Sequence, residues 1–156
     1  MTVRLALFEP DIPQNTGTVL RLGACMGVGV DVIEPCGFVW DEKRMRRSGM
    51  DYLDHVNLIR HASWQAFQNT NPSRLVLLTT KADTFFNTFA FQPGDTLLLG
   101  RESAGVPDHV HQSAHASIRI PMAPAMRSIN VAVSAAMVLA EALRQLNAYP
   151  EEKSGD

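Results

Sequence analysis

Residues 4–35, RLALFEPDIPQNTGTVLRLGACMGVGVDVIEP, decide the fold because two kinds of hydrophobic pattern alternate within them. Apolar runs over 4–9 and 30–35 predict buried strands, and the stretch 14–26 between them predicts a helix. Strands with continuous apolar runs, joined by helices, are typical of a parallel sheet that is covered on both faces. This segment therefore predicts an α/β fold.

The same alternation continues along the chain. Further strands are predicted over 55–60, 74–80, 95–100 and 117–122. Further helices are predicted over 63–70, 107–114 and 129–147, with a helical turn over 42–48. The expected architecture is a mostly parallel sheet flanked by helices. It forms a single domain over 1–150, and an acidic tail over 151–156 is expected to be disordered.

The composition is that of a globular domain. The chain has 156 residues, of which 46% are hydrophobic and 19% are charged, enough for one core. Its two cysteines form no CxxC or zinc spacing, which favours a reducing compartment, and Cys25 is expected in the core. No apolar run approaches the roughly 18 residues of a membrane span, and a signal-peptide pattern is missing. We therefore expect a cytoplasmic protein.

Charge is distributed unevenly along the chain. The net charge is −2, which argues against non-specific coating of nucleic acid. A local basic block, KRMRR, nevertheless contributes four cations at Lys43, Arg44, Arg46 and Arg47. With Trp40 and Tyr52 nearby, this block is a candidate for binding RNA phosphates and stacking a base. The alternative is a solvated helical turn.

Several common sites are missing from the sequence. The glycine-rich stretch GACMGVGV (23–30) lies after a helix and before a strand, the reverse of a dinucleotide-binding loop. No P-loop or GxSxG elbow occurs. His109, His111 and His115 cluster without a nearby cysteine, so we predict a solvated helix edge there and no metal site.

Three segments place polar residues at predicted element boundaries. In PQNTGTVLRLGA (13–24), Pro13, Asn15 and Thr16 are typical of a helix start. In LLLGRESAGVP (97–107), a strand ends at Gly100, where a missing side chain lets backbone groups approach a flat ligand. The third, IPMAPAMRSIN (120–130), joins a strand end to the last helix. Each segment also has a plain interpretation, as a helix cap or as a strand-to-helix loop.

These segments carry three spaced motifs in order. They are NxGxxxR at Asn15, Gly17 and Arg21, GxExxGxP at Gly100, Glu102, Gly105 and Pro107, and IPM…RSxN from Ile120 to Asn130. Together they resemble the motifs of the SpoU branch of the SPOUT methyltransferases. The resemblance covers almost the whole chain, because FEPDIPQNTG, IEPCGFVWDEKRMRRSGMDY and LTTKA are similar to the small tRNA (cytidine/uridine wobble) 2′-O-methyltransferases.

The resemblance implies a fold and a cofactor. The C-terminal region would be threaded into a trefoil knot, which no periodicity predicts because knots are rare. The knot would form a pocket for S-adenosylmethionine, largely from backbone groups. The residues expected at the cofactor are Leu78, Gly100, Ile120 and Met122, with Ser128 beside it. Ser128 and Asn130 are then expected to be pocket and knot residues rather than helix caps alone.

The resemblance also implies a reaction, the methylation of the wobble ribose in a tRNA anticodon stem-loop. The family assigns a catalytic role to its first-motif arginine, here Arg21. An arginine is very hard to deprotonate, so we favour a clamp on phosphate or ribose. Glu102 is either the proton acceptor or, as we favour, a residue that holds its own loop. The alternatives are a ribosomal RNA 2′-O-methyltransferase and a non-catalytic nucleotide- or RNA-binding module.

The last predicted helix is apolar around most of its circumference. Its polar residues form one narrow stripe of Asn130, Ser134, Glu141, Arg144 and Gln145. One sheet covers only one side of such a helix. We therefore expect a homodimer, as in the family, in which Ala135 and Leu139 lie at the interface; the alternative is a well-buried terminal helix.

Overall fold

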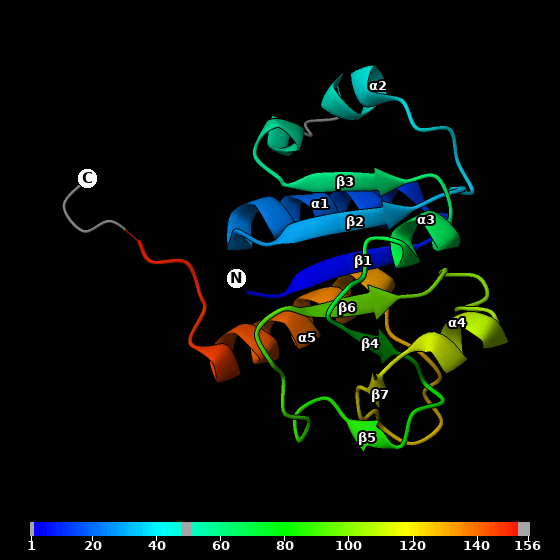
Figure 1. Cartoon of the computed structure of the whole chain (residues 1–156), viewed down its shortest axis with the longest axis vertical. Coiled ribbons are helices and arrows are strands. Elements are labelled where there is room, and N and C mark those ends of the chain that lie inside the picture. The colour runs from blue at the N-terminus through cyan, green and yellow to red at the C-terminus, as the bar shows by residue number, and fades with distance from the viewer. Residues whose placement is uncertain (1, 48–50, 153–156) are drawn as a thin grey trace.

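The computed structural model describes residues 2–47 and 51–152. Within these residues one sheet runs in the order β3-β2-β1-β6-β4-β7-β5, and all neighbouring strands are parallel (Figure 1). The strands are β1 (Arg4–Phe8), β2 (Gly29–Ile33), β3 (Leu58–His61), β4 (Arg74–Leu78), β5 (Thr84–Phe85), β6 (Asp95–Leu99) and β7 (Ala116–Arg119). This confirms the predicted parallel α/β architecture.

Six of these strands were predicted, with ends that differ from the observed ones by at most three residues. The strand β5 was not predicted, because it has only two residues, Thr84 and Phe85, and both are exposed. It pairs with β7 at the sheet edge, through Thr84 opposite Ile118 and Phe85 opposite Arg119. A two-residue edge strand has no hydrophobic period that a sequence could show.

All five predicted helical segments are present. They are α1 (Pro13–Met26), α2 (Glu42–Arg47), α3 (Trp64–Gln68), α4 (Asp108–Ser113) and α5 (Val131–Leu146). A 3₁₀ turn, η1 (Asp51–Asp54), was not predicted. The predicted helical turn over 42–48 ends one residue beyond the described part, and the predicted tail lies outside it from residue 153 onward.

The helix α1 begins without a side-chain cap. Its N-cap is Ile12, and Pro13 occupies the first helical position, where a missing N–H costs nothing. The predicted helix start at Pro13, Asn15 and Thr16 is confirmed, because all three lie in the first turn, although neither Asn15 nor Thr16 caps the helix. Cys25 is exposed rather than in the core. The helix ends at Gly27, whose φ of 67° is left-handed.

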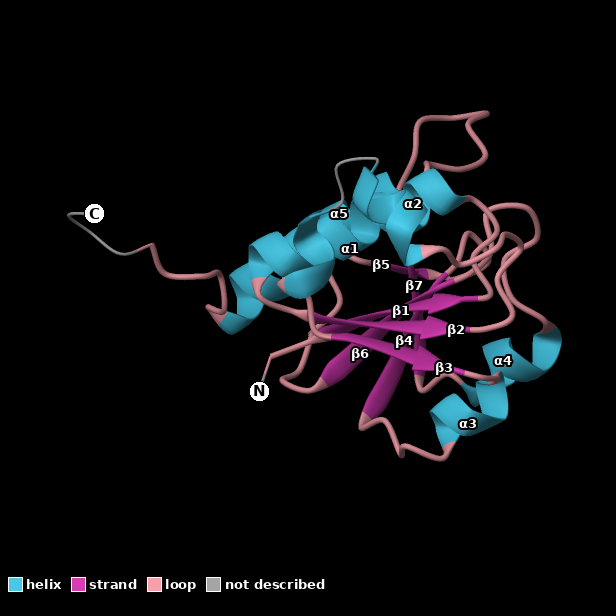
Figure 2. Cartoon of the chain, turned by 90° about the horizontal axis from the view of Figure 1, so that it is seen from above, coloured by secondary structure: helices cyan, strands magenta, loops and turns pink. Residues whose placement is uncertain are grey.

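Helices cover both faces of the sheet (Figure 2). On one face α1 and α5 enclose a core with Leu5, Leu7, Val30 and Leu97. On the other face α3 and α4 pack on a smaller core that includes Phe8, Ile33 and Leu98. Alternate residues of the same strand enter different cores, which explains why the apolar runs are continuous.

The helix α5 packs against α1 as well as against the sheet. Its residues Ala135 and Leu139 are each 1% exposed and belong to the core of the chain itself. The prediction that these two residues lie at a subunit interface is therefore wrong. The exposed large apolar residues of α5 are instead Val133, at 50%, and Met137, at 37%.

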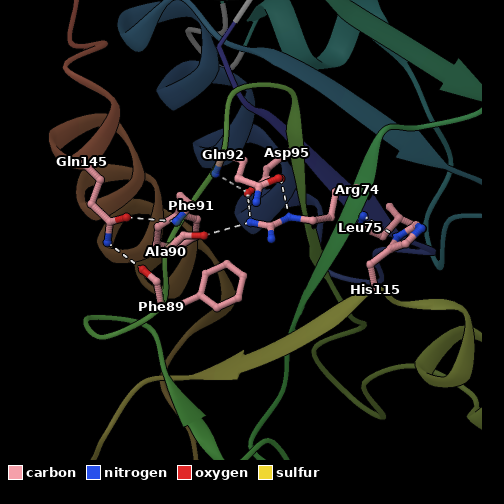
Figure 3. Close-up of polar contacts among 9 residues, drawn as sticks. All are labelled: Arg74, Leu75, Phe89, Ala90, Phe91, Gln92, Asp95, His115 and Gln145. Atoms are coloured by element: carbon pink, nitrogen blue, oxygen red, sulfur yellow. Dashed lines mark hydrogen bonds and ion pairs between the residues drawn. The ribbon is translucent and has the colours of Figure 1, made fainter.

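Gln145, one residue of the polar stripe of α5, holds the segment between β5 and β6 (Figure 3). The Gln145 side chain accepts a hydrogen bond from Phe91 N (2.9 Å) and donates one to Phe89 O (2.8 Å). From the sheet side, Arg74 donates to Ala90 O and forms a bidentate pair with the buried Asp95. The segment 89–91 is thereby fixed on both sides, where an exposed loop would leave its backbone groups to water.

Candidate functional site

A pocket of about 730 Å³ lies beyond the carboxyl ends of three neighbouring strands. It is lined by Leu78 at the end of β4, by Gly100 just after β6, and by Ile120 just after β7. Parallel α/β sheets bind ligands at this edge, because strand ends and helix starts leave backbone groups unpaired there. The position of the pocket agrees with the one that the sequence predicted.

The structure brings most of the sequence-predicted site residues together in this pocket. Its lining includes all five residues that the family resemblance assigns to the cofactor, namely Leu78, Gly100, Ile120, Met122 and Ser128. It also includes Asn15, Glu102 and Asn130. Gly17 and Arg21 lie outside the lining; Gly17 is buried in α1, and Arg21 is exposed on the same helix.

One wall of the pocket is the loop 100–105, which closes on itself. Arg101 N and Gly105 O, and Gly105 N and Arg101 O, form two backbone hydrogen bonds of 2.9 Å each. A Cβ on Gly100 would lie 2.7 Å from the carbonyl carbon of Gly105. The glycine is therefore required by its own loop, and not only by a ligand as the sequence suggested.

Arg101 has a structural place that its sequence context did not reveal. Its Nε donates to Gly105 O (3.2 Å), and its guanidinium lies 3.8 Å from the carboxylate of Glu9. The same guanidinium lies over the ring of Phe8, 5.5 Å from its centroid. Arg101 therefore ties the pocket loop to the end of β1.

Glu102 is held by residues that precede and open α1. Its carboxylate accepts hydrogen bonds from Asp11 N (3.1 Å) and from the Asn15 side-chain amide (3.3 Å). In return, Glu102 N donates to the Asp11 carboxylate (3.2 Å), which also accepts from the Ser103 hydroxyl. These contacts agree with the loop-holding role that the sequence analysis favoured for Glu102.

The paired carboxyl groups perturb each other. Burial raises the pKa of Glu102, and the side-chain hydrogen bond with Asp11 raises it further. The pKa of Asp11 is lowered, first by its side-chain hydrogen bond with Glu102 and then by that with Ser103. Within the pair, ionisation of Asp11 is therefore favoured over ionisation of Glu102.

Asn130 both caps α5 and faces the pocket. Its side-chain oxygen accepts from Ala132 N (2.9 Å) and Val133 N (3.2 Å), which leaves the amide nitrogen free to donate elsewhere. That nitrogen donates to the side-chain oxygen of Asn15 (3.1 Å). The first and third sequence motifs therefore meet through two asparagine side chains.

Arg21 lies on the solvent side of α1. Its guanidinium stacks over the ring of Tyr52 at 4.6 Å from the centroid. Such a pair orients the cation without neutralising it. Tyr52, a candidate for base stacking in the sequence, therefore has this face occupied by Arg21.

The basic block occupies α2, away from the pocket lining. Lys43, Arg44 and Arg47 are exposed, as a phosphate-binding surface requires. Arg46 is exposed too, but forms a bidentate ion pair with Asp54 at 2.8 and 2.9 Å. Trp40, the other aromatic candidate, stacks with Phe38 and lies under the guanidinium of Arg60.

Two cations that sequence analysis did not single out also line the pocket. They are Lys81, after β4, and Arg119, at the end of β7. Arg119 lies over the ring of Phe85, and its Nε is buried without a hydrogen-bond partner among the described residues. An arginine between two isoleucines gives no sign in the sequence that its side chain reaches a pocket.

The structure gives no support for a metal site, a reactive cysteine or a membrane-spanning helix among the described residues. Over residues 2–47 and 51–152, no group of three His, Cys, Asp or Glu side chains is placed to hold a metal ion. His115 instead accepts a hydrogen bond from Leu75 N through its Nδ1 (2.9 Å). Burial raises the pKa of Cys36 to about 11, so its thiol is not an activated nucleophile at neutral pH. No helix in the described part of the chain is long and apolar enough to cross a membrane.

Comparison with known proteins relates this arrangement to one family. The model of the SpoU rRNA Methylase family matches residues 2–140. A tRNA (cytidine(34)-2′-O)-methyltransferase of Beijerinckia indica subsp. indica is 59% identical over 147 residues, which are 92% of this chain and 92% of that protein.

Solved structures show the same fold. A structure described as "Structural insights into the 2-OH methylation of C/U34 on tRNA" superposes with a TM-score of 0.87 at 35% identity, and covers 94% of this chain and 97% of that one. The SpoU methyltransferase AviRb from Streptomyces viridochromogenes, in complex with AdoMet, has a TM-score of 0.79 at 26% identity. That match covers 94% of this chain and 61% of AviRb.

Proposed function

Because the chain belongs to the SpoU methylase family, we propose that it transfers a methyl group from S-adenosylmethionine to the 2′-hydroxyl of the wobble nucleotide of tRNA. The observation that carries this proposal is the pocket itself. It combines the three family motifs at one sheet edge, in a chain that is 59% identical to a tRNA (cytidine(34)-2′-O)-methyltransferase. A ribosomal RNA substrate is the alternative.

The pocket suits the cofactor. Apolar side chains of Leu78, Ile120 and Met122 line it together with Gly100, which fits a flat base that also needs backbone hydrogen bonds. The volume is also within the usual range for a ligand of that size. S-adenosylmethionine, when bound, supplies an activated methyl group on a sulfonium sulfur.

The chain's own residues then have to align the ribose with that methyl group. In the transfer, the 2′-oxygen forms a bond to the methyl carbon as the carbon–sulfur bond breaks, and the hydroxyl proton passes to water. We assign Arg21 to clamp the phosphate or ribose, since its charge is not neutralised by Tyr52. Ser128 and Asn130 would face the reacting groups from the pocket side.

A homodimer is part of the proposal. Val133 and Met137 on α5 and Ile12 before α1 expose apolar surface, which supports an isologous contact between two copies. Arg21 is absent from the lining of its own chain's pocket, so we assign it to a substrate shared between two subunits. Lys43, Arg44, Arg46 and Arg47 would contact the anticodon stem.

The trefoil knot also belongs to the proposal. After the near-edge strand β7 the chain returns across the sheet, so that α5 packs on α1 and β6. Gln145 of α5 is hydrogen-bonded to the segment 89–91, which lies between β5 and β6. These contacts support threading of α5 through a loop made by the segments that precede β6 and β7.

We further propose that residues 1–150 act as one domain, with a short acidic tail, and that the protein works in the cytoplasm.

The experiment that tests the function is nucleoside analysis by mass spectrometry of tRNA from cells that lack the protein. We expect the loss of 2′-O-methylcytidine or a 2′-O-methylated uridine from the wobble position. Unchanged tRNA together with a missing ribose methylation in ribosomal RNA would favour the alternative.

A further inference from the structure

Asp11 lies outside the pocket lining and outside the three sequence motifs, yet it forms three hydrogen bonds with the pocket loop, whereas Asn15 forms one. It exchanges backbone-to-carboxylate hydrogen bonds with Glu102 in both directions, at 3.1 and 3.2 Å. Its second oxygen accepts from the Ser103 hydroxyl. Together with Asn15, these contacts use all four carboxylate oxygens of the two residues.

From Glu102 a directed chain of hydrogen bonds leads into the pocket. The Asn130 amide nitrogen donates to Asn15, and the Asn15 amide nitrogen donates to Glu102. The oxygen of Asn130 is held by the first amides of α5. Each amide therefore has one orientation only: that of Asn130 is set by α5, and that of Asn15 is set by Asn130 together with the Glu102 carboxyl.

The position of Asp11 is fixed by the segment around Gly37. A Cβ on Gly37 would lie 2.6 Å from the Cβ of Asp11, so the two backbones are in close contact. Gly37 N also donates to Pro10 O (2.9 Å). Asp11 is thus held between the segment around Gly37 and the pocket loop, and transmits a fixed position to Glu102.

The loop has a separate closure at its cofactor side. Gly100 is kept in place by the two hydrogen bonds between Arg101 and Gly105, neither of which involves Asp11. Loss of the Asp11 carboxylate should therefore disturb Glu102 and Asn15 while leaving the Gly100 wall closed.

From this arrangement we propose that Asp11 is a positioning residue of the methyl transfer, acting through Glu102 to hold the Asn15 amide, and its hydrogen bond with Asn130, in place for the substrate ribose. The proposal rests on the proposed function. It separates binding of the cofactor, which Asp11 does not serve, from alignment of the nucleophile, which it does.

The test compares transfer to a tRNA substrate with binding of S-adenosylhomocysteine in Asp11→Ala. We expect kcat to fall at least about tenfold, with the Kd of S-adenosylhomocysteine changed less than about threefold. Asp11→Asn should recover most of the activity, because its oxygen still accepts from Glu102 N and its amide can donate to the Glu102 carboxylate. Asp83→Ala is the matched control, since Asp83 is exposed and outside the pocket lining.

A double-mutant cycle with Glu102→Gln shows whether Asp11 acts through Glu102. In that background Asp11→Ala should lower kcat by less than about twofold, since the chain is already broken. If Asp11→Ala does not fold, Asp11→Ser, which keeps one oxygen beside the Glu102 amide, takes its place with the same expectations.

Three results would overturn the proposal. They are kcat of Asp11→Ala within threefold of wild type, parallel losses of kcat and cofactor affinity, and independent effects of the two substitutions in the cycle. A wild-type protein that methylates no tRNA would instead refute the proposed function, before any variant is made.

Discussion

Gly100→Ala is the perturbation whose effect the structure defines best. The new Cβ would lie 2.7 Å from the carbonyl carbon and 2.8 Å from the Cα of Gly105. These distances are about 0.8 Å inside the roughly 3.5 Å at which carbon atoms make contact. The obstacle is backbone, so no side-chain rotation relieves the clash, and the loop 100–105 has to move.

The free-energy cost of that movement follows from the hydrogen bonds that it weakens. It lengthens the two 2.9 Å hydrogen bonds between Arg101 and Gly105, each worth about 0.5–1.5 kcal/mol. The resulting loss of about 1–3 kcal/mol agrees with the usual cost of overpacking. If cofactor binding requires the closed loop, affinity should fall by about 5- to 150-fold. The melting temperature should fall by about 2–12 °C.

Calorimetric titration with S-adenosylhomocysteine measures the first effect and thermal unfolding the second. Gly27→Ala is the matched control, because Gly27 has a φ of 67° and no neighbouring atom within 4 Å of a new Cβ. Strain there should cost about 1–2 kcal/mol of stability and leave cofactor affinity unchanged. Wild-type affinity in a folded Gly100→Ala protein would refute the reasoning.

Three further predictions concern the RNA, the dimer and acid stability. Arg21→Ala should bind S-adenosylhomocysteine as wild type does but lose at least about 100-fold in transfer rate, and activity within a few-fold of wild type would show that Arg21 is misassigned. Val133→Glu, on the exposed face of α5, should give monomers in sedimentation equilibrium, whereas Gln65→Glu on α3 should not; a wild type that is already a fully active monomer would contradict the dimer. Hydrogen bonds from Arg144, and then from Gln145, lower the pKa of Glu141 from its ordinary value of 4.5 to about 2. The ionised Glu141 therefore stabilises the folded state above pH 4.5, and this contribution is lost as the pH falls toward 2. In urea unfolding, Glu141→Gln should therefore be less stable than wild type at pH 6, and the gap should close at pH 2; an equal gap at both values would count against this assignment.

Much of the fold was predictable because hydrophobic period carries it. Six strands and five helices follow from apolar runs, and the pocket position follows from the parallel sheet. The predictions that were wrong concerned features that depend on contacts between residues far apart in the sequence. Ala135 and Leu139 face α1 and the sheet of their own chain, and no helical period tells that surface from a dimer surface.

The site shows the same division. The motif residues could be found, but not the reasons for them. Gly100 is a glycine because of Gly105, and Asn15 bonds to Glu102 and Asn130 instead of capping α1. Asp11 was missed because its partner is 91 residues away, and a single acidic residue before an apolar one carries no signal.

The central claim is that this chain methylates the wobble ribose of tRNA, and one measurement tests it directly. Purified protein is incubated with methyl-labelled S-adenosylmethionine and an unmodified anticodon stem-loop, or with the same stem-loop carrying a 2′-deoxynucleotide at position 34. The account predicts label in the first RNA, located on the ribose of nucleotide 34 by mass spectrometry, and none in the second. Label in both RNAs, or in neither while ribosomal RNA is methylated, would contradict it.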